Sequence, residues 1–498
     1  MRYIDGVMKL LAPLVAATLF AGAVEGFGQG SDPIGVSALR AYDPTLTGSG
    51  VVVAQAEAIY SGSDGFEVNP SATGQSGSNF VYIGENGSVA TGYPNSVGSE
   101  SGHADHVGEL FYGDVNTSDP EGVAPGVSEI YNYEADYFVN TIVGNETAIS
   151  ARIVNQSFVA TTGDNAEQAQ IEQMYDNYAA RYNTLFISAV GNGGQVYAPG
   201  SAYNGIGVAA YGGASSTGPT YDGRSKPDIT APEAATSFST PLVAGAAAIL
   251  LQAAERGDAG TGTESNASDA RVLKALLLNG AVKPPGWTHT DTAPLDPNYG
   301  AGILNVDNSY MNLRAGEHGI SGATSGSVGS IASGSIVPDE GWDFASISTA
   351  KVSGSYTAES NHYLFDLTGA TAPEFTLTST LTWDRHNGQT DINNLDLYLF
   401  DATTGTDVAV SDSTIDNVQE LYVQDLAPGN YDLVVMKAGG TSVNSGGTVV
   451  SGAESYALAF NFAPVPEPSA GWLVGPGVVA MMLVANRRKL RAGGRGVI

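Results

Sequence analysis

Hydrophobic and polar positions follow two different rhythms along the chain of 498 residues. Between about 32 and 315, apolar runs at 51–54, 152–154 and 185–190 are separated by stretches whose apolar residues recur every three or four positions. The stretch AEQAQIEQMYDNYAARYNT has this helical spacing, and the apolar run LFISAV follows it directly. This order of strand, helix and strand predicts an α/β domain with a parallel sheet covered by helices.

The C-terminal third has a different pattern. From 341 to about 463, short strands alternate with turns, as in EFTLTSTLTW and LDLYLFDATTG, and no helical period appears. This pattern predicts a second, all-β domain of the sandwich type. The segment between the two domains is rich in glycine and serine, so we expect a linker or a flexible edge hairpin there. The predicted boundaries are therefore 30–315, 316–340 and 341–463.

The N-terminus has the composition of a sorting signal. Residues 1–29 begin with Arg2 and Lys9, continue with an apolar stretch over 10–23 and include small residues at 21–23. This order of basic, apolar and small residues predicts a secretory signal peptide, so we expect the mature protein to start near residue 30.

The C-terminal segment 464–498 combines Pro466-Glu467-Pro468, an apolar stretch over 470–485 and a basic cluster over 487–491. This order resembles the PEP-CTERM sorting tail of Gram-negative bacteria. The resemblance implies processing by an exosortase and delivery to an extracellular polysaccharide matrix, so we expect a secreted or cell-surface protein. The alternative is a simple C-terminal membrane anchor, because the basic cluster would stay inside the cell. In either case we expect contact with the membrane only through this segment.

The balance of charge narrows the classes of partner. The formal net charge is −31, and the chain has only 20 lysines and arginines. Phosphate binding needs clustered basic residues, so we expect no nucleic-acid partner. The chain has no cysteine, which excludes disulfides and thiolate metal sites.

Three polar residues stand where an apolar pattern changes. Glu57 follows the strand VVVAQA, His103 lies in the small-residue stretch SGHADHVGEL, and Ser237 precedes a long apolar helix. A serine at a helix N-terminus lies among free N–H groups and near the positive end of the helix dipole, which suits a nucleophile whose transition state is an oxyanion. Taken singly, each residue has a simpler role: a surface acid, a partly buried histidine and an N-cap.

Taken together, acid, histidine and serine in this order resemble the subtilisin-like serine proteases, the subtilases. Five stretches match the motifs of that family in family order, over roughly 34–310. The histidine motif is matched by HADHV, the cleft motif by VNQS, the oxyanion strand by VGN, the Lys-Pro-Asp motif before the nucleophile by KPDI and the nucleophile motif by ATSFSTPLVAG; these stretches lie at 103–107, 154–157, 190–192, 226–229 and 235–245.

The resemblance implies a subtilisin-like fold, a three-layer parallel sheet with helices on both faces, and a serine endopeptidase that cleaves proteins or peptides through an acyl-enzyme. Ser237 is then the nucleophile and His103 its base, while the Asn192 side chain and the Ser237 N–H bind the oxyanion. Ser157 and Gly191 are then substrate-binding residues. The family strand Gly-Val-x-Val-Ala-Val-x-Asp is matched here by GVVVAQAE, so Glu57 stands in the place of the triad aspartate. Asp64, in the following loop, is a weaker candidate for this acid.

Departures from the family motifs keep a second hypothesis open. The triad acid is a glutamate, Phe238 and Leu242 replace the family's methionine and histidine, and Ala235 replaces a glycine beside the nucleophile. The alternative is therefore a catalytically inactive subtilase-fold protein with a structural or binding role in the extracellular matrix. Retention of the histidine, the serine and the oxyanion asparagine favours the enzyme.

No cofactor is required by this resemblance. His103 and His106 have the spacing of a metal-binding pair, but the resemblance makes the first of them catalytic. In the second domain, oxygen ligands for Ca²⁺ could come from Asp391, Asn393, Asn394 and Asp396. Turn and strand-edge polarity is the simpler reason for these four residues.

Overall fold

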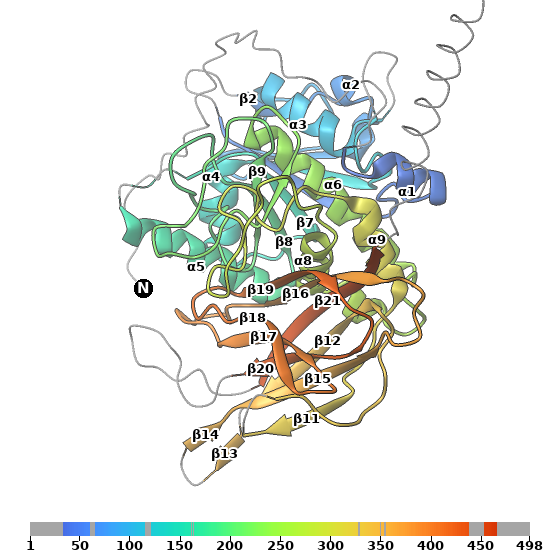
Figure 1. Ribbon diagram of the computed structural model, residues 1–498. Helices are drawn as coiled ribbons and strands as arrows, with labels where there is room; N and C mark the ends of the chain where they lie inside the picture. Colours follow the sequence, from blue (N-terminus) through green and yellow to red (C-terminus); the bar gives the residue numbers. More distant parts are fainter. Residues whose placement is uncertain are drawn as a thin grey trace, which may run out of the picture.

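The computed structural model describes residues 33–59, 65–114, 121–160, 162, 164–326, 329–348, 350–352, 355–437 and 453–465. The predicted signal peptide, Asp64 and nearly all of the predicted C-terminal tail lie outside the described residues. Figure 1 shows an α/β part, coloured from blue to yellow, with the orange and red strands of an all-β part packed below it.

An eight-stranded sheet forms the centre of the α/β part, in the order β10-β9-β8-β7-β1-β6-β3-β4. Its first seven strands run parallel, and only β4 is antiparallel to its neighbour. The predicted parallel sheet is therefore confirmed, with β1 in the middle. The strands are β1 (Val52–Glu57), β3 (Phe80–Ile83), β4 (Val89–Ala90), β6 (Glu129–Glu134), β7 (Ile153–Gln156), β8 (Leu185–Ala189), β9 (Ile206–Ala210) and β10 (Ile229–Ala231).

Helices cover both faces of this sheet, because its strands carry apolar side chains on both sides. One core cluster joins Val53 of β1 to apolar residues of α3, α6, α8 and α9, and another joins Ala54 and Ala56 to residues of α5 and η2. The helices are α1 (Val36–Tyr42), α2 (Pro70–Thr73), α3 (Gly102–Tyr112), α4 (Ala135–Tyr137), η2 (Phe138–Val143), α5 (Asn165–Tyr182), α6 (Thr236–Glu255), α7 (Glu264–Ala267), α8 (Ala270–Asn279) and α9 (Val306–Ala315), with a short 3-10 turn, η1 (Gly77–Asn79).

Helix α6 is the long apolar helix that the sequence predicted. In the described part of the chain it is the one helix with the length and hydropathy of a membrane span, yet 94% of its most apolar window is buried inside the fold. Small residues dominate its middle, and Gly245 lies so close to Val123 that an added Cβ would approach the valine Cβ to 2.4 Å. Close packing against the segment after α3 and against the sheet therefore explains its composition.

The C-terminal part is a sandwich of two antiparallel sheets, as predicted. Their strand orders are β11-β15-β20-β17-β18 and β12-β21-β16-β19. Strand β11 lies inside the glycine- and serine-rich segment and pairs with β15. The strands are β11 (Gly322–Ser325), β12 (Glu340–Ser348), β15 (Glu359–Asp366), β16 (Glu374–Trp383), β17 (Leu395–Asp401), β18 (Thr406–Ser411), β19 (Val418–Leu426), β20 (Asn430–Lys437) and β21 (Ala453–Val465); two small sheets pair β2 (Gly65–Glu67) with β5 (Ser99–Glu100) and β13 (Ala350–Val352) with β14 (Ser355–Thr357).

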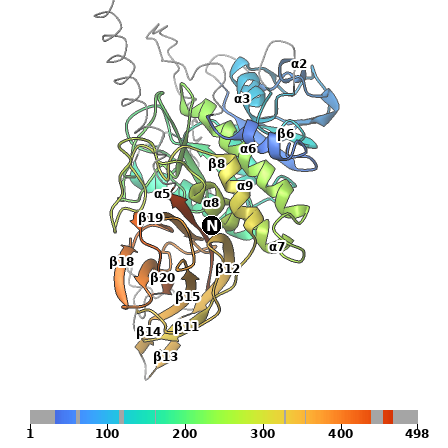
Figure 2. The same ribbon diagram turned by 45° about the vertical axis from the view of Figure 1, so that its right-hand side comes forward.

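The two parts share one packed interface. Helix α8 lies against β16 and β21 (Figure 1), and Figure 2 shows the all-β part below α8 from a second side. Trp342 of the sandwich belongs to the same apolar cluster as the central helices. Buried ion pairs cross the interface: Arg385 contacts Asp176 at 2.6 Å, and Lys283 contacts Glu420. The sandwich is therefore packed on the α/β part as a continuation of its core.

Candidate active site

Glu57 and His103 meet at the carboxyl end of the sheet. Glu57 is the last residue of β1 and is 1% exposed, while His103 is the second residue of α3. The Nδ1 atom of His103 lies 2.8 Å from Oε2 of Glu57. A carboxylate only accepts hydrogen bonds, so Nδ1 carries the proton and Nε2 has the free lone pair of the neutral ring. This is the tautomer that a general base needs toward a serine.

The surroundings of His103 favour a charged ring. Burial lowers the pKa of His103, but the charge of Glu57 and its hydrogen bond raise it, and the net effect is a pKa above the ordinary histidine value. The Nε2 atom is buried and has no hydrogen-bond partner among the described residues. His103 is therefore arranged to take up a proton at Nε2 and to hold the resulting charge.

Ser237 lies at the second position of α6, and its side chain is fully buried. The N-cap of this helix is Ala235, so Ser237 does not have the capping role that is the simpler alternative for a serine here. Its Oγ donates to the backbone oxygen of Ser157 at 3.3 Å, and not to His103. In return, Ser157 Oγ donates to the backbone oxygen of Ser237 at 2.7 Å. The structure thus places Ser157 directly beside the predicted nucleophile.

Asn192 lies next to the start of the same helix. Its Oδ1 accepts from both the N–H and the hydroxyl of Thr236, at 2.9 and 2.8 Å. These two bonds orient the amide, so its NH₂ group is the end left to donate. The preceding Gly191 has φ of +106°, and an added Cβ would come within 2.7 Å of Ser216 Oγ. A glycine is therefore needed for the turn that presents Asn192.

The first turn of α6 also has a free donor. The N–H of Thr236 is bound to Asn192, and the N–H groups of Phe238 and Ser239 are bound to the backbone oxygen of Ala235. Within the described residues, this leaves the Ser237 N–H without an acceptor at the helix N-terminus. Together with the Asn192 amide it can bind a developing oxyanion.

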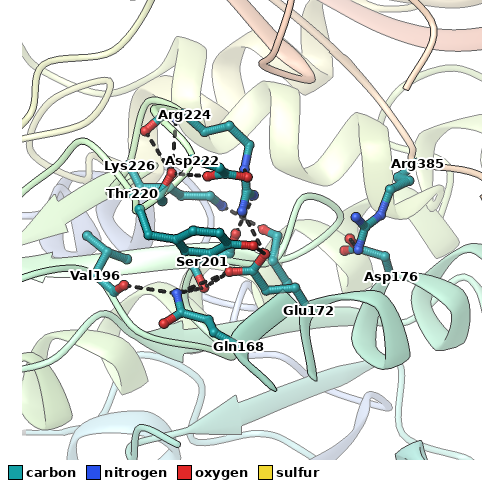
Figure 3. Close-up of polar contacts among 12 residues, drawn as sticks. Gln168, Glu172, Asp176, Val196, Ser201, Thr220, Asp222, Arg224, Lys226 and Arg385 are labelled. Atoms are coloured by element: carbon teal, nitrogen blue, oxygen red, sulfur yellow. Dashed lines mark hydrogen bonds and ion pairs between the residues drawn. The ribbon is translucent and has the colours of Figure 1, made fainter. Parts of the chain in front are cut away.

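A buried ionic network holds the loop that follows β8, as Figure 3 shows. The Arg224 guanidinium contacts Glu172 of α5 at 2.7 Å and donates to the Ser201 backbone oxygen at 2.5 Å. Glu172 also accepts from the Ser201 hydroxyl at 2.5 Å, and Gln168 donates both to Glu172 and to the loop backbone. The loop that begins at Asn192 is therefore fixed to α5, and the sequence pattern carried no signal for this network.

Two further residues at the site were not predicted. The ring of Phe238 lies 5.6 Å from the ring of His103 and 4.5 Å from that of His106, between centroids. Gln55, fully buried on β1, donates from Nε2 to Oε1 of Glu57 at 2.9 Å. The available signal was weak: a polar residue inside an otherwise apolar strand, two positions before an acid.

The residues considered as metal ligands have other partners. His106 contacts Glu109 at 3.0 Å, and Asn393 donates to the buried Glu454. Asn394 donates to Asp396 at 3.2 Å, and burial raises the pKa of Asp396 to about 7. In the ranges that the structure describes, no group of three or more His, Asp or Glu residues is arranged to hold a metal ion. In this structure Asn393, Asn394 and Asp396 therefore bond to each other or to Glu454.

Comparison with known sequences gives one partial match. Residues 65–302 match the sequence model of the subtilase family, Peptidase_S8. This span is just under half of the chain; it contains His103, Asn192 and Ser237 and begins after Glu57. No curated protein matches the chain.

Several solved structures are similar at low identity. The protease domain of PatA is 23% identical, with a TM-score of 0.40, over 54% of this chain and 98% of that chain. The prenylagaramide maturation protease PagA is 21% identical, with a TM-score of 0.40, over 57% and 99%. Fervidolysin from Fervidobacterium pennivorans, a keratinolytic enzyme related to subtilisin, is 13% identical, with a TM-score of 0.39, over 84% and 78%.

The family match covers His103, Asn192 and Ser237 and the helices α3 and α6, while β1 and Glu57 lie before its first residue. Its span ends before the β-sandwich, which adds a separate all-β region to the chain. Residues 65–302 therefore match the subtilase family of serine proteases, and the chain has the subtilisin-like α/β fold.

Proposed function

We propose that this protein is a serine endopeptidase that uses Glu57, His103 and Ser237 to hydrolyse peptide bonds in proteins or peptides. The observation that carries the proposal is the 2.8 Å contact between Glu57 and Nδ1 of His103, which leaves Nε2 of the ring buried and unpartnered. His103 also lies 5.6 Å, between ring centroids, from Phe238, the residue that follows Ser237 on α6.

The reaction follows from the positions of these groups. The Ser237 hydroxyl leaves the Ser157 carbonyl and gives its proton to Nε2 of His103, while Oγ attacks the peptide carbonyl carbon. The oxyanion is bound by the Asn192 amide and the Ser237 N–H, each worth roughly 3–4 kcal/mol of transition-state stabilisation. His103 then gives the proton to the leaving amine, and the C–N bond breaks. Water hydrolyses the acyl-enzyme by the same route in reverse order.

The two ends of the chain support a place of action. A signal peptide over 1–29 and the PEP-CTERM-like order over 464–498 favour a secreted protein that an exosortase cuts and attaches to the extracellular matrix of a Gram-negative bacterium. Intact-mass measurement of protein from the matrix of such a host should show that residues after about 466–470 are missing. A full-length protein that ends at Ile498 and stays in the membrane would favour the simple anchor.

One observation favours the second candidate, an inactive subtilase fold with a binding role. In this structure the Ser237 hydroxyl is buried and donates to Ser157 instead of His103. A resting enzyme can also show such a contact, because catalytic hydrogen bonds often shorten only when substrate is bound. Reactivity of the serine therefore separates the two candidates.

The test is labelling with a serine-reactive fluorophosphonate. We expect one label per chain in the wild type, and none in Ser237→Ala or His103→Ala. The matched control is Ser239→Ala, because Ser239 is equally buried on the same helix and donates to the backbone oxygen of Ala231 at 2.9 Å. Labelling that persists in Ser237→Ala, or that is absent from the folded wild type, would overturn the proposal.

A further inference from the structure

Gln55 occupies an unusual position for an amide. It lies on β1, the central strand, two residues before Glu57, so both side chains point to the same face of the sheet. Neighbouring strands flank it, with Gln55 opposite Asn132 of β6 and Asn155 of β7. The side chain has no exposure to solvent. A buried amide is costly unless its donors and its acceptor are satisfied, so its partners show what it is for.

Both the Nε2 and the Oε1 atom of Gln55 have hydrogen-bond partners. Its Nε2 donates to Oε1 of Glu57 at 2.9 Å and to the backbone oxygen of Ala104 at 2.9 Å, and its Oε1 accepts from the Tyr112 hydroxyl at 2.6 Å. Burial raises the pKa of Tyr112 far above its ordinary value, so this phenol stays neutral and keeps its O–H donor. The tyrosine therefore fixes which end of the Gln55 amide faces Glu57.

With these bonds, each oxygen of the Glu57 carboxylate has its own hydrogen-bond donor. Oε1 is held by Gln55, and Oε2 accepts from His103. The same Gln55 amide also holds the carbonyl of Ala104, the residue that follows His103 on α3. A single side chain therefore ties the acid to the helical turn that carries the histidine.

A glutamate needs such a restraint more than an aspartate does. It has one more methylene and one more rotatable bond, so its carboxylate samples more positions and loses more freedom when it is held. In the family strand pattern, the position of Gln55 is a valine and the position of Glu57 is an aspartate. Both departures fall on one strand of this chain, and the two side chains bond directly to each other.

We propose that Gln55 is a positioning residue for the reaction: it holds the longer Glu57 side chain in the place of a triad aspartate, and Tyr112 orients Gln55 in turn. The inference rests on the proposed function. Because Gln55 touches neither substrate nor the reacting atoms, its whole effect passes through Glu57. Loss of this restraint lowers turnover, since displacement of a catalytic group by about 1 Å can cost about 10²-fold.

A double-mutant cycle tests whether Gln55 acts on turnover through Glu57. We expect Gln55→Leu to lower kcat by roughly 10–100-fold with KM unchanged. In a Glu57→Ala background, Gln55→Leu should lower kcat by less than about 2-fold, because the group through which it acts is absent. Equal losses in both backgrounds, or no loss in either, would overturn the proposal.

The matched control is Gln419→Leu in the sandwich. Gln419 is also fully buried, donates from Nε2 to two backbone oxygens at 2.9 and 2.8 Å, and accepts from the Ser411 hydroxyl at 2.6 Å. Gln419 also accepts from the Ser413 N–H at 3.3 Å, so Gln419→Leu breaks at least as many buried hydrogen bonds as Gln55→Leu, on β19 of the sandwich instead of on β1. We expect this variant to lower thermal stability as much as Gln55→Leu does, with kcat unchanged. A loss of kcat that matches that of Gln55→Leu would assign the effect to general destabilisation.

Two further measurements test the role of Gln55 if Gln55→Leu does not fold or if the wild type has no protease activity. Tyr112→Phe removes only one hydroxyl, and it should lower kcat in the same Glu57-dependent manner. In Ser237→Ala protein, which needs no activity, the His103 Nδ1–H should give a downfield NMR proton signal that broadens when Gln55→Leu is added. An inactive wild type would refute the protease while this signal still tests Gln55; an unchanged signal would refute the role of Gln55 alone.

Discussion

The replacement Glu57→Gln tests the triad most directly, because the structure predicts how the new amide would turn. Gln55 presents an N–H donor to Oε1 of Glu57, so an amide at position 57 would place its carbonyl oxygen there. Its NH₂ group would then face Nδ1 of His103, at the position where Oε2 lies 2.8 Å away. A donor at this point requires His103 to accept at Nδ1, so the ring proton moves to Nε2. His103 would carry the wrong tautomer for accepting the proton of Ser237.

The expected loss of turnover is roughly 10³–10⁴-fold, the size found when a triad aspartate becomes its amide. In free energy this is about 4–5.5 kcal/mol of transition-state stabilisation. The change is nearly isosteric and stays inside the same hydrogen-bond network, so the variant should fold. Its thermal unfolding curve and circular dichroism spectrum provide the check on folding.

The assay is steady-state kinetics on an unstructured protein substrate, beside the rate of fluorophosphonate labelling of Ser237. Both rates should fall together, since both need His103 as a base. Glu57→Asp should retain more activity than Glu57→Gln, because it keeps a carboxylate as the partner of His103. Equal turnover in the wild type and Glu57→Gln would refute the reasoning, and the acid would have to be sought elsewhere, beginning with Asp64.

Further predictions concern pH and charge. Because the pKa of His103 is raised and the ring must be neutral to act as base, kcat/KM should fall as pH drops through a value above that of an ordinary histidine; an acid limb at or below the ordinary value would contradict this. Burial raises the pKa of Asp343 to about 6 and of Glu420 to about 7, so the folded state holds protons that the unfolded chain releases near pH 4. Stability should therefore be fully present below about pH 4 for these groups and decline up to about pH 7, which scanning calorimetry would show as a higher Tm at pH 5.5 than at pH 8. Lys283→Met leaves Glu420 buried without its counter-charge and should lower the unfolding free energy by about 3–5 kcal/mol at pH 8, but much less at pH 5.5, in denaturant titrations; an equal loss at both pH values would mean that the ion pair is not the cause.

The sequence was most informative where burial imposes a period. Strand β1 was predicted because a parallel strand between two layers of helices is apolar on both faces, and α5 because its apolar residues recur at helical spacing. Glu57 and His103 were candidates because each ends or begins an element, and the structure brings them together. Their distance in the chain could not show that they would meet; the family motifs supplied that step.

Other features of the fold and of the site had no local signal in the sequence. The pairs Arg224–Glu172 and Lys283–Glu420 join residues far apart in the sequence. The sequence around a charged residue does not show whether its side chain is solvated or buried. Gln55 interrupts an apolar strand, but only its contact with Glu57 gives it meaning. Strand β11 lies in a glycine- and serine-rich stretch whose composition predicts flexibility, and its pairing with β15 places it in the sheet. Composition describes the preference of a segment, while long-range partners decide its state.

The packing of the sandwich on α8 has a mechanical consequence. Strand β21, the last described element, runs for 13 residues between β12 and β16, in the sheet that rests on α8. A pull on the chain beyond Val465 is therefore applied along this strand and loads its many ladder hydrogen bonds together, as shear, instead of opening them one at a time. The buried ion pairs pass the load on to the α/β part. A protein tethered through its C-terminus would thus be held through the longest strand that the structure describes, in the sandwich and not in the large sheet that carries Glu57.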